Sequence, residues 1–266
     1  MDLSIIIVNY HSRDQLASCL DSLFCNPPSL NFEVIVVDNN SGDDLSGLTK
    51  LYPGTKFLYS GRNLGMGGGN NLGISQAFGT YILVINPDTI INALAIEIMV
   101  EYLSRHLTVG LVGPKLLYPD HSLQMSCARF PSFFIPLLRR TFLGRLFSKQ
   151  RDWFLMNNFD HQTIQAVDWL MGSCLLFKKE IKLPSGEIFR PRFDERYFMY
   201  FEDIDLAREM KAHGLQVVYN PQASIIHNHQ RQSARYPWYL AIFLNPLARE
   251  HIFSWIKYFR KWKFKI

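Results

Sequence analysis

Polar side chains that could bind a ligand or a metal ion follow a short apolar segment of the sequence. The segment covers residues 81–85 and leads directly into Asn86-Pro87-Asp88. A run this short, rich in Ile and Val and stopped by Pro, predicts a buried strand. Asp88 then stands at the carboxyl end of that strand, the edge where open α/β sheets bind ligands. Its carboxylate and the amide of Asn86 could hold a divalent cation and a diphosphate, or the tripeptide could be an ordinary turn.

A second acidic group opens a helix predicted over residues 202–213. Glu202, Asp203 and Asp205 fall in its first turn, where the helix dipole alone favours acidic residues. The preceding residues 198–201 are aromatic or apolar, and a carboxylate beside such a wall has its pKa raised toward the working range of a general base. The pattern therefore permits either acid–base catalysis or a simple helix start.

Two further polar residues stand at the ends of predicted strands. Asp38 follows a strand over 32–37, where it could accept hydrogen bonds from a ribose or a base, or could form an Asx turn. His227 ends an apolar strand over 223–227, which follows a separate predicted strand over 216–219. A neutral imidazole near Asp88 could complete the coordination of a metal, although strand-end histidines are more often structural.

A glycine-rich segment over residues 65–70 precedes a helix that is predicted to run to about Ala77. It is not a GxGxxG motif, because Asn70 takes the last position and the segment follows the third strand. It also lacks the Lys-Ser/Thr pair of a P-loop. These features exclude a dehydrogenase-type dinucleotide fold and leave two readings, a tight turn or a close approach to a nucleotide.

Strands and helices must position these residues. The first four predicted strands cover residues 4–8, 32–37, 56–59 and 82–85. Helical segments follow the first and third of these strands and a loop follows the second, which predicts an α/β fold with a doubly wound, mostly parallel sheet flanked by helices. Right-handed crossovers then bring the carboxyl ends of the strands to one edge. We therefore expect Asn9, Asp38, Asn63 and Asp88 to line one crevice.

The composition is that of a folded domain, with 48% hydrophobic and 19% charged residues. We expect neither a signal peptide nor a transmembrane helix, because every apolar run is too short. The four cysteines have no metal-binding spacing, which favours reduced thiols in a cytosolic protein.

The net charge of +5 is concentrated in two basic, aromatic spans. One lies between Asp120 and Asp152, and the other is the C-terminal segment 234–266, which we expect to be a basic amphipathic helical appendage. Such a helix could lie on an anionic membrane surface, or it could pack on the core with a solvated basic face. No nucleic-acid motif accompanies the charge, so we expect no nucleic-acid partner.

Eight motifs follow one another along the chain. They are SIIIVNY, VIVVDNNSGD, GRNLGMGGGNNLGI, YILVINPDT, GLVGPKL, MGSCLLFKKE, FDERYFMYFEDIDLAREMKAHG and ASIIHNH. With them the chain resembles the family 2 glycosyltransferases of the GT-A fold, and most closely the bacterial rhamnosyltransferase-like branch. The resemblance runs from about Leu3 to about Ser233, and the full order of motifs is far more specific than any one of them.

The resemblance implies an inverting transfer of a sugar from a nucleoside diphosphate to a hydroxyl, assisted by Mg²⁺ or Mn²⁺. Asp88 is similar to the last Asp of the family's DxD metal motif, in which Asn86 replaces the first. By the same comparison, Asp203 in the Glu202-Asp203 pair matches the catalytic base, and His227 matches a metal ligand. The expected donor-binding residues are Asn9, Tyr10, Asp38, Arg62, Asn63, Asn86, Asp88 and Arg231.

Together these expectations define a GT-A domain over 1–233, with a nucleotide-sugar-binding half (1–118) and an acceptor and catalytic half (119–233), followed by the segment 234–266. The expected donor is dTDP-L-rhamnose, the acceptor is a glycan or lipid-linked saccharide of cell-surface polysaccharide synthesis, and the location is the cytoplasmic face of the inner membrane. The alternatives are a UDP-hexose donor, a silent binding module for nucleotide sugar or membrane surface, and a nucleotidyltransferase.

Overall fold

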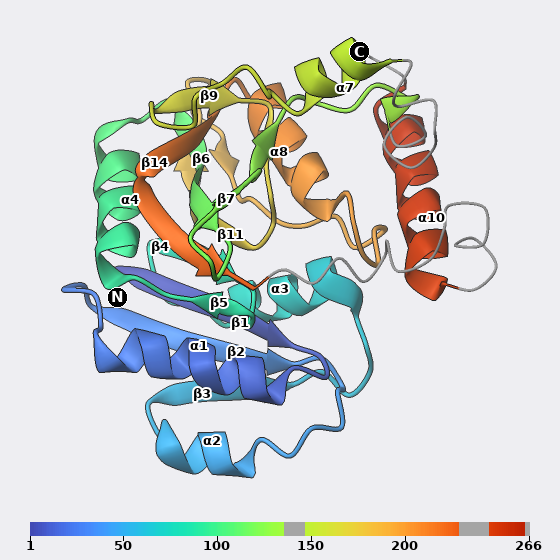
Figure 1. Ribbon diagram of the computed structural model, residues 1–266. Helices are drawn as coiled ribbons and strands as arrows, with labels where there is room; N and C mark the ends of the chain where they lie inside the picture. Colours follow the sequence, from blue (N-terminus) through green and yellow to red (C-terminus); the bar gives the residue numbers. More distant parts are fainter. Residues whose placement is uncertain (136–146, 229–244, 264–266) are drawn as a thin grey trace.

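The apolar strands of the N-terminal half form the parallel part of a mixed sheet. A computed structural model describes residues 1–135, 147–228 and 245–263 (Figure 1). In it, β1 (Leu3–Asn9) pairs in parallel with both β2 (Phe32–Asp38) and β4 (Tyr81–Ile85), and β3 (Thr55–Tyr59) continues the sheet beyond β2. The Ile- and Val-rich sequences of β1, β2 and β4 are explained by burial on both faces, as in other parallel sheets.

The C-terminal half extends the same sheet with strands of both directions. β11 (Cys174–Lys178) is antiparallel to its two neighbours, β4 and β6 (Val109–Leu117). Beyond β6, β14 (Gln216–His227) runs parallel to it, and the short β5 (Thr89–Ile90) pairs antiparallel with the end of β14. The remaining short strands are β7 (Leu123–Gln124), β8 (Cys127–Ala128), β9 (Gln165–Val167), β10 (Trp169–Leu170), β12 (Ile181–Lys182) and β13 (Ile188–Phe189).

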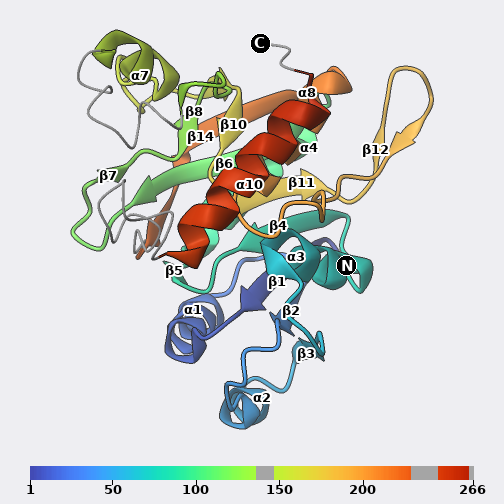
Figure 2. The same ribbon diagram turned by 90° about the vertical axis from the view of Figure 1, so that its right-hand side faces the viewer.

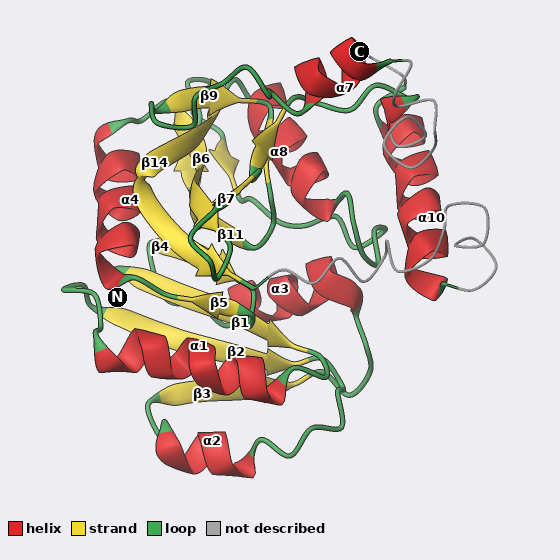
Figure 3. Ribbon diagram, in the orientation of Figure 1, coloured by secondary structure: helices red, strands yellow, loops and turns green. Residues whose placement is uncertain are grey.

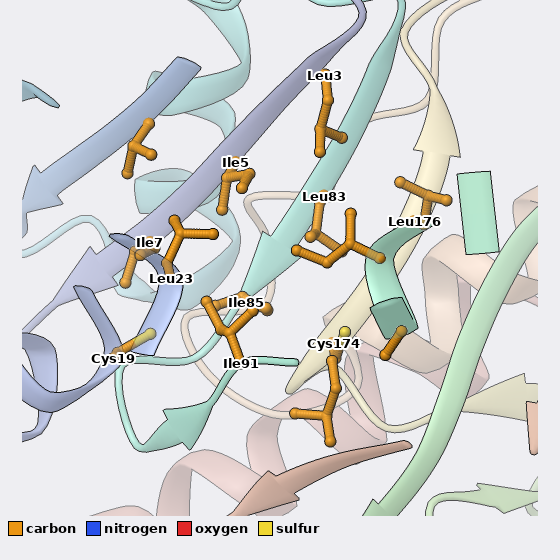
Figure 4. Close-up of a cluster of buried hydrophobic side chains, with 14 of the residues drawn as sticks. Leu3, Ile5, Ile7, Cys19, Leu23, Leu83, Ile85, Ile91, Cys174 and Leu176 are labelled. Atoms are coloured by element: carbon orange, nitrogen blue, oxygen red, sulfur yellow. The ribbon is translucent and has the colours of Figure 1, made fainter. Parts of the chain in front are cut away.

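Helices cover both faces of the sheet (Figure 3). One face packs on α1 (Arg13–Cys25), α2 (Ser46–Leu51) and α4 (Ala93–Arg105), and the other on α3 (Gly65–Ser75) and α8 (Glu202–Ala212). The alternation of side chains along each strand creates the two apolar layers. Leu3, Ile5 and Ile7 of β1 share a buried cluster with residues of α1, and Figure 4 shows Ile7 beside Leu23 and Cys19.

Two helices lie outside these layers. The short α7 (Ser148–Phe154) follows the first gap in the described chain, and α10 (Pro246–Lys261) packs through Tyr258 and Phe259 against an aromatic cluster that includes Tyr197 and Phe201. The helix expected in the segment 234–266 is therefore present. The sequence allowed two placements for this helix, on a membrane surface or packed on the core. Tyr258 and Phe259 are packed on the core.

The predicted α/β architecture, a doubly wound and mostly parallel sheet flanked by helices, is confirmed. Three local predictions differ from the structure. The sequence analysis missed α2, and it divided β14, which continues through a bulge between Asn220 and Ser224, into two strands. It also predicted a glycine-rich loop where the glycines form the first turns of α3.

Close packing explains the glycine at the start of α3. Gly65 has a φ of +75°, and a Cβ atom there would lie 2.1 Å from the carbonyl oxygen of Phe198. The same oxygen accepts a hydrogen bond from the amide of Met66 at 2.9 Å. The connection that precedes α8 therefore rests directly on the backbone of α3, and any side chain at position 65 would push it away.

This packing predicts a difference between two glycines with similar backbones. Gly61 also has a positive φ, +71°, but nothing lies within 4 Å of its Cβ position. We expect Gly61→Ala to lower the free energy of unfolding by about 1–2 kcal/mol through backbone strain alone. Gly65→Ala should add roughly 1–3 kcal/mol because the Phe198 backbone must move. Urea denaturation measures both, and equal losses would show that the contact with Phe198 is unimportant.

Candidate active site

Strand pairing brings together an acid and a histidine that lie far apart in the sequence. The antiparallel pairing of β5 with β14 places Thr89 opposite His227, and the amide of Asn228 donates to the Asp88 carbonyl at 2.8 Å. As a result, Nε2 of His227 lies 3.3 Å from Oδ1 of Asp88. The imidazole is only 1% exposed and the carboxylate 27%, so the pair faces solvent through the acid.

A cleft of about 270 Å³ opens beside this pair, at the carboxyl ends of the parallel strands. Four of the predicted site residues line it, namely Tyr10, Asn63, Asn86 and Asp88. Its lining also contains Asn39 and Met199, which were not predicted. The crevice expected at this edge of the sheet is therefore present, and residues far apart in sequence meet in it.

Asn9 and Asp38 lie at the same edge but face each other. The Nδ2 atom of Asn9 is 3.0 Å from Oδ1 of Asp38, 3.1 Å from Oγ of Ser41 and 3.0 Å from Oδ2 of Asp43. The Ser41 hydroxyl donates to the same oxygen of Asp38. These buried contacts stabilise the loop after β2, and neither Asn9 nor Asp38 lines the cleft.

Asn39 links two cleft-forming loops. Its Oδ1 accepts from the amide of Leu64 at 2.8 Å, and its Nδ2 donates to Oδ1 of Asn63 at 3.0 Å and to the carbonyl of Gly65 at 3.1 Å. The end of β2 is thereby joined to the start of α3. The sequence offered no separate signal for Asn39, because an Asn after Asp38 is equally expected in a turn. Arg62, in contrast, is exposed and does not line the cleft, and Arg231 lies outside the described residues.

Backbone amides hold the Asp203 carboxylate close to the end of β4. Its Oδ2 accepts from the amide of Gly172 at 2.9 Å and its Oδ1 from the amide of Ile204 at 2.8 Å. The next carbonyl, that of Ser173, accepts from the amide of Asn86 at 2.9 Å. Asp203 is thus linked by one short backbone segment to the residues that carry Asp88, although it does not itself line the cleft.

Burial gives the two adjacent acids different protonation. It raises the pKa of Asp203 to about 6, against the opposing effect of the two amides that stabilise its charge. Burial also raises the pKa of Glu202, and the negative charge of Asp203 raises it further. Oε2 of Glu202 has no hydrogen-bond partner among the described residues. At neutral pH, Asp203 is therefore the ionised member of the pair and Glu202 the protonated one.

Comparison of the sequence with known families identifies the class of protein that carries this cleft. The sequence model described as Glycosyl transferase family 2 matches residues 4–164. The chain belongs to glycosyl transferase family 2. The cleft residues of its N-terminal half fall inside this match, whereas Asp203 and His227 lie beyond it.

Curated relatives of this glycosyltransferase cover nearly its whole length. An N-acetylglucosaminyl-diphospho-decaprenol L-rhamnosyltransferase of Mycobacterium tuberculosis is 30% identical over 256 residues, which are 88% of this chain and 78% of the relative. The rhamnosyltransferase WbbL of Escherichia coli K12 is 26% identical over 264 residues, 94% of each chain. The chain is thus a glycosyltransferase of the rhamnosyltransferase-like branch of the family.

Solved structures confirm the GT-A fold. A mannosyltransferase of Pyrobaculum calidifontis, solved with GDP-Man and Mn²⁺, matches with a TM-score of 0.60 at 17% identity. The match covers 97% of this glycosyltransferase and 64% of that chain. TarS of S. aureus matches with a TM-score of 0.58 at 16% identity, over 87% of this chain and 37% of TarS.

The Asp88–His227 pair has the geometry of two neighbouring metal ligands. A divalent ion about 2.1 Å from an oxygen and a nitrogen at right angles would hold those atoms about 3.0 Å apart. The observed separation is 3.3 Å. No cluster of three or more His, Cys, Asp or Glu residues suited to a metal occurs in the described parts of the chain. The pair could therefore hold an ion whose other ligands are water or phosphate oxygens.

Gln124 fixes the orientation of the histidine and was missed in the sequence. Its Oε1 lies 2.7 Å from Nδ1 of His227. A carbonyl oxygen can only accept, so this contact favours the tautomer with the proton on Nδ1, in which Nε2 is available to bind a metal ion. Gln124 is 2% exposed and belongs to β7, a strand too short to leave a periodic pattern. Outer partners of this kind orient metal-binding histidines and increase their affinity.

This contact predicts that Gln124→Leu weakens metal binding. With a nucleoside diphosphate present, we expect the Kd for Mn²⁺ to rise roughly 10- to 100-fold, because the imidazole loses its fixed orientation. Gln222 is exposed on β14, the strand that carries His227, so Gln222→Leu is the matched control and should leave the Kd unchanged. Calorimetric titration measures the Kd, and the same value in both variants would exclude a role for Gln124.

Proposed function

We propose that the protein is an inverting, metal-assisted glycosyltransferase that moves L-rhamnose from dTDP-L-rhamnose to a hydroxyl of a glycan or lipid-linked saccharide during synthesis of cell-surface polysaccharide. The observation that carries the reaction is the Asp88–His227 pair beside a cleft, with an ionised, amide-bound Asp203 linked to the end of the same strand. The names of both curated relatives support rhamnose as the sugar, and the name of the mycobacterial relative supports a lipid-linked acceptor.

In the proposed mechanism, the chain binds the nucleotide in the cleft and the acceptor beside Asp203. Asp88 and His227 would hold Mg²⁺ or Mn²⁺, and the ion would neutralise the negative charge of the departing diphosphate. Asp203 accepts the proton of the acceptor hydroxyl while that oxygen bonds to the anomeric carbon. The bond from that carbon to the diphosphate oxygen breaks on the opposite face, which inverts the configuration. Protonated Glu202 leaves the base as the only charged member of the acid pair.

Donor recognition is proposed for residues at the edge of the cleft. Tyr10 and Asn63 line it and would contact the base or ribose. Asn9 and Asp38 support this edge through their buried contacts, and one oxygen of Asp38 still accepts only the weak 3.4 Å contact from the Ser41 amide. Arg62 and Arg231 remain proposed contacts to the donor. A UDP-hexose donor would use the same residues, and a screen of nucleotide sugars decides between the two.

The assigned base predicts a large loss of activity from a small change. Asp203→Asn should lower kcat about 10²- to 10⁴-fold because the amide cannot accept the proton. The exposed Asp120→Asn is the control and should keep the normal rate. Since Asp203 must be ionised to act and its raised pKa is about 6, kcat should rise with pH through about 6 and then level off. Transfer from dTDP-L-rhamnose measures both effects, and a wild-type rate in Asp203→Asn would refute the assignment.

We also propose association with an anionic membrane surface at the cytoplasmic face of the inner membrane. Among the helices that the structure describes, none is long and apolar enough to span a bilayer. Two large rings near α10 are exposed instead, Phe253 at 52% and Phe134 at 64%, and the neighbouring Phe133 contacts Trp255 of α10. Exposed aromatic rings beside basic residues suit the interfacial region of a membrane.

This surface predicts selective loss of lipid binding. The protein should co-sediment with anionic liposomes, and the double variant Phe134→Ser/Phe253→Ser should reduce the bound fraction severalfold by removing apolar surface. Phe78 is 75% exposed on the loop after α3, so Phe78→Ser tests whether any exposed ring matters. Equal sedimentation of the two variants would disprove this membrane-binding surface.

A further inference from the structure

The connection that leads into α8 ends in a strained backbone. Tyr200 and Phe201 have φ angles of +68° and +70°, in the left-handed region that residues with side chains rarely adopt. Two such residues in succession persist only where the surrounding structure holds them, and such strain is often found at functional sites. Phe201 directly precedes Glu202, the first residue of α8. The backbone of Tyr200 and Phe201 therefore sets the position of Asp203 in the first turn of that helix.

One face of α10 holds this connection along its length (Figure 2). Ser254 donates its hydroxyl to the carbonyl of Met199 at 2.8 Å, and Lys257 donates its ammonium to the carbonyl of Arg196 at 2.6 Å. Lys261 lies 3.0 Å from a carboxylate oxygen of Asp194. The three donors are spaced three and four residues apart, which places them on one side of the helix.

The last turn of α10 also binds α8 itself. Lys261 lies 2.6 Å from one oxygen of Asp205, and Nε1 of Trp262 lies 2.7 Å from the other. The hydroxyl of Tyr197 donates to that second oxygen at 3.2 Å. Asp205 is 1% exposed and stands two residues after Asp203, so its three donors fix the first turn of the helix that carries the base.

The opposite side of the connection rests on α3. The carbonyl of Phe198 accepts from the amide of Met66, and Gly65 leaves room for it, as described above. The next residue, Met199, lines the cleft. The strained connection is therefore held between two helices, α3 on the cleft side and α10 on the outer side.

We propose that α10 is a clamp that holds the connection over residues 194–201 in its strained conformation and thereby places the Asp203 carboxylate, with Lys261 as its main positioning residue. The proposal rests on the role of Asp203 as the base. Under this proposal α10 contributes to the catalytic site. Without α10, the first turn of α8 would move away from Gly172.

Lys261→Met tests the clamp by two independent measurements. Amide hydrogen exchange over residues 194–205 should become faster, because the connection loses its fixed position. The kcat for transfer should fall roughly 10- to 100-fold while the KM for the donor stays nearly constant, since the base and not the donor cleft is displaced. Lys263 is exposed and forms no ion pair with the described residues, so Lys263→Met should change neither measurement.

A second pair of variants separates strain from general loss of packing. In the Lys261→Met background, Tyr200→Gly relieves the left-handed strain, whereas Tyr200→Ala removes the same ring and keeps the strain. We expect Tyr200→Gly to recover slow exchange and a good part of kcat, and Tyr200→Ala to recover neither. Unchanged exchange in Lys261→Met, or equal behaviour of the Gly and Ala variants, would overturn the clamp. If the wild type transferred no sugar, the proposed function would fail, while the exchange measurements would still decide on the clamp.

Discussion

Backbone hydrogen bonds from the three residues that follow β4 join the two halves of the site. On one side, the amide of Asn86 binds the carbonyl of Ser173, next to the Gly172 amide that holds Asp203. On the other side, the carbonyl of Asp88 binds the amide that follows His227. Main-chain geometry therefore sets the positions of Asp203 and the Asp–His pair relative to each other.

The acid pair at the start of α8 has a thermodynamic consequence. Both folded-state pKa values are raised, so between about pH 4 and the folded pKa values the folded chain binds more protons than the unfolded chain. The stability linked to Glu202 and Asp203 is therefore fully present at low pH and is lost as the pH rises through those values. The catalysis proposed for Asp203 needs the ionised form. Under this proposal the site works in the pH range where these residues stabilise the fold least, a common relation between activity and stability.

Sequence patterns predicted the parts of the structure that repeat along the chain. Buried strands with polar ends were recognisable because apolar runs and turn residues alternate, and the topology then required Asp88 and the other strand-end residues to share one edge. The antiparallel insertion of β11 between β4 and β6 could not be predicted, because its apolar run CLLF fits either direction. Gln124 could not be found either, since a strand of two residues has no period and the partner of Gln124 lies 103 residues away.

Contacts between distant segments explain the glycines of α3, for which the sequence allowed two explanations. From the sequence, these glycines could form a tight turn or allow a nucleotide to approach closely. At Gly65 the close neighbour is instead the backbone of Phe198, and at Gly69 it is the side chain of Val8 in β1. Both contacts join segments that are far apart in the sequence. The glycines of α3 therefore indicate a close neighbour, but they do not identify which segment it is.

The C-terminal helix shows the same limit for charge. The sequence has five positive residues in its last ten, which suggested a surface that attracts anionic lipid. Lys261 is instead 17% exposed between Asp194, Asp205 and Glu209, and Lys257 donates to a backbone carbonyl. Less positive charge is therefore available to a membrane than the sequence count implies. A helix that uses its basic residues inside the protein must rely more on exposed aromatic rings to contact a lipid surface. The two proposed roles of α10, holding the connection before α8 and contacting lipid, then belong to different faces of the helix.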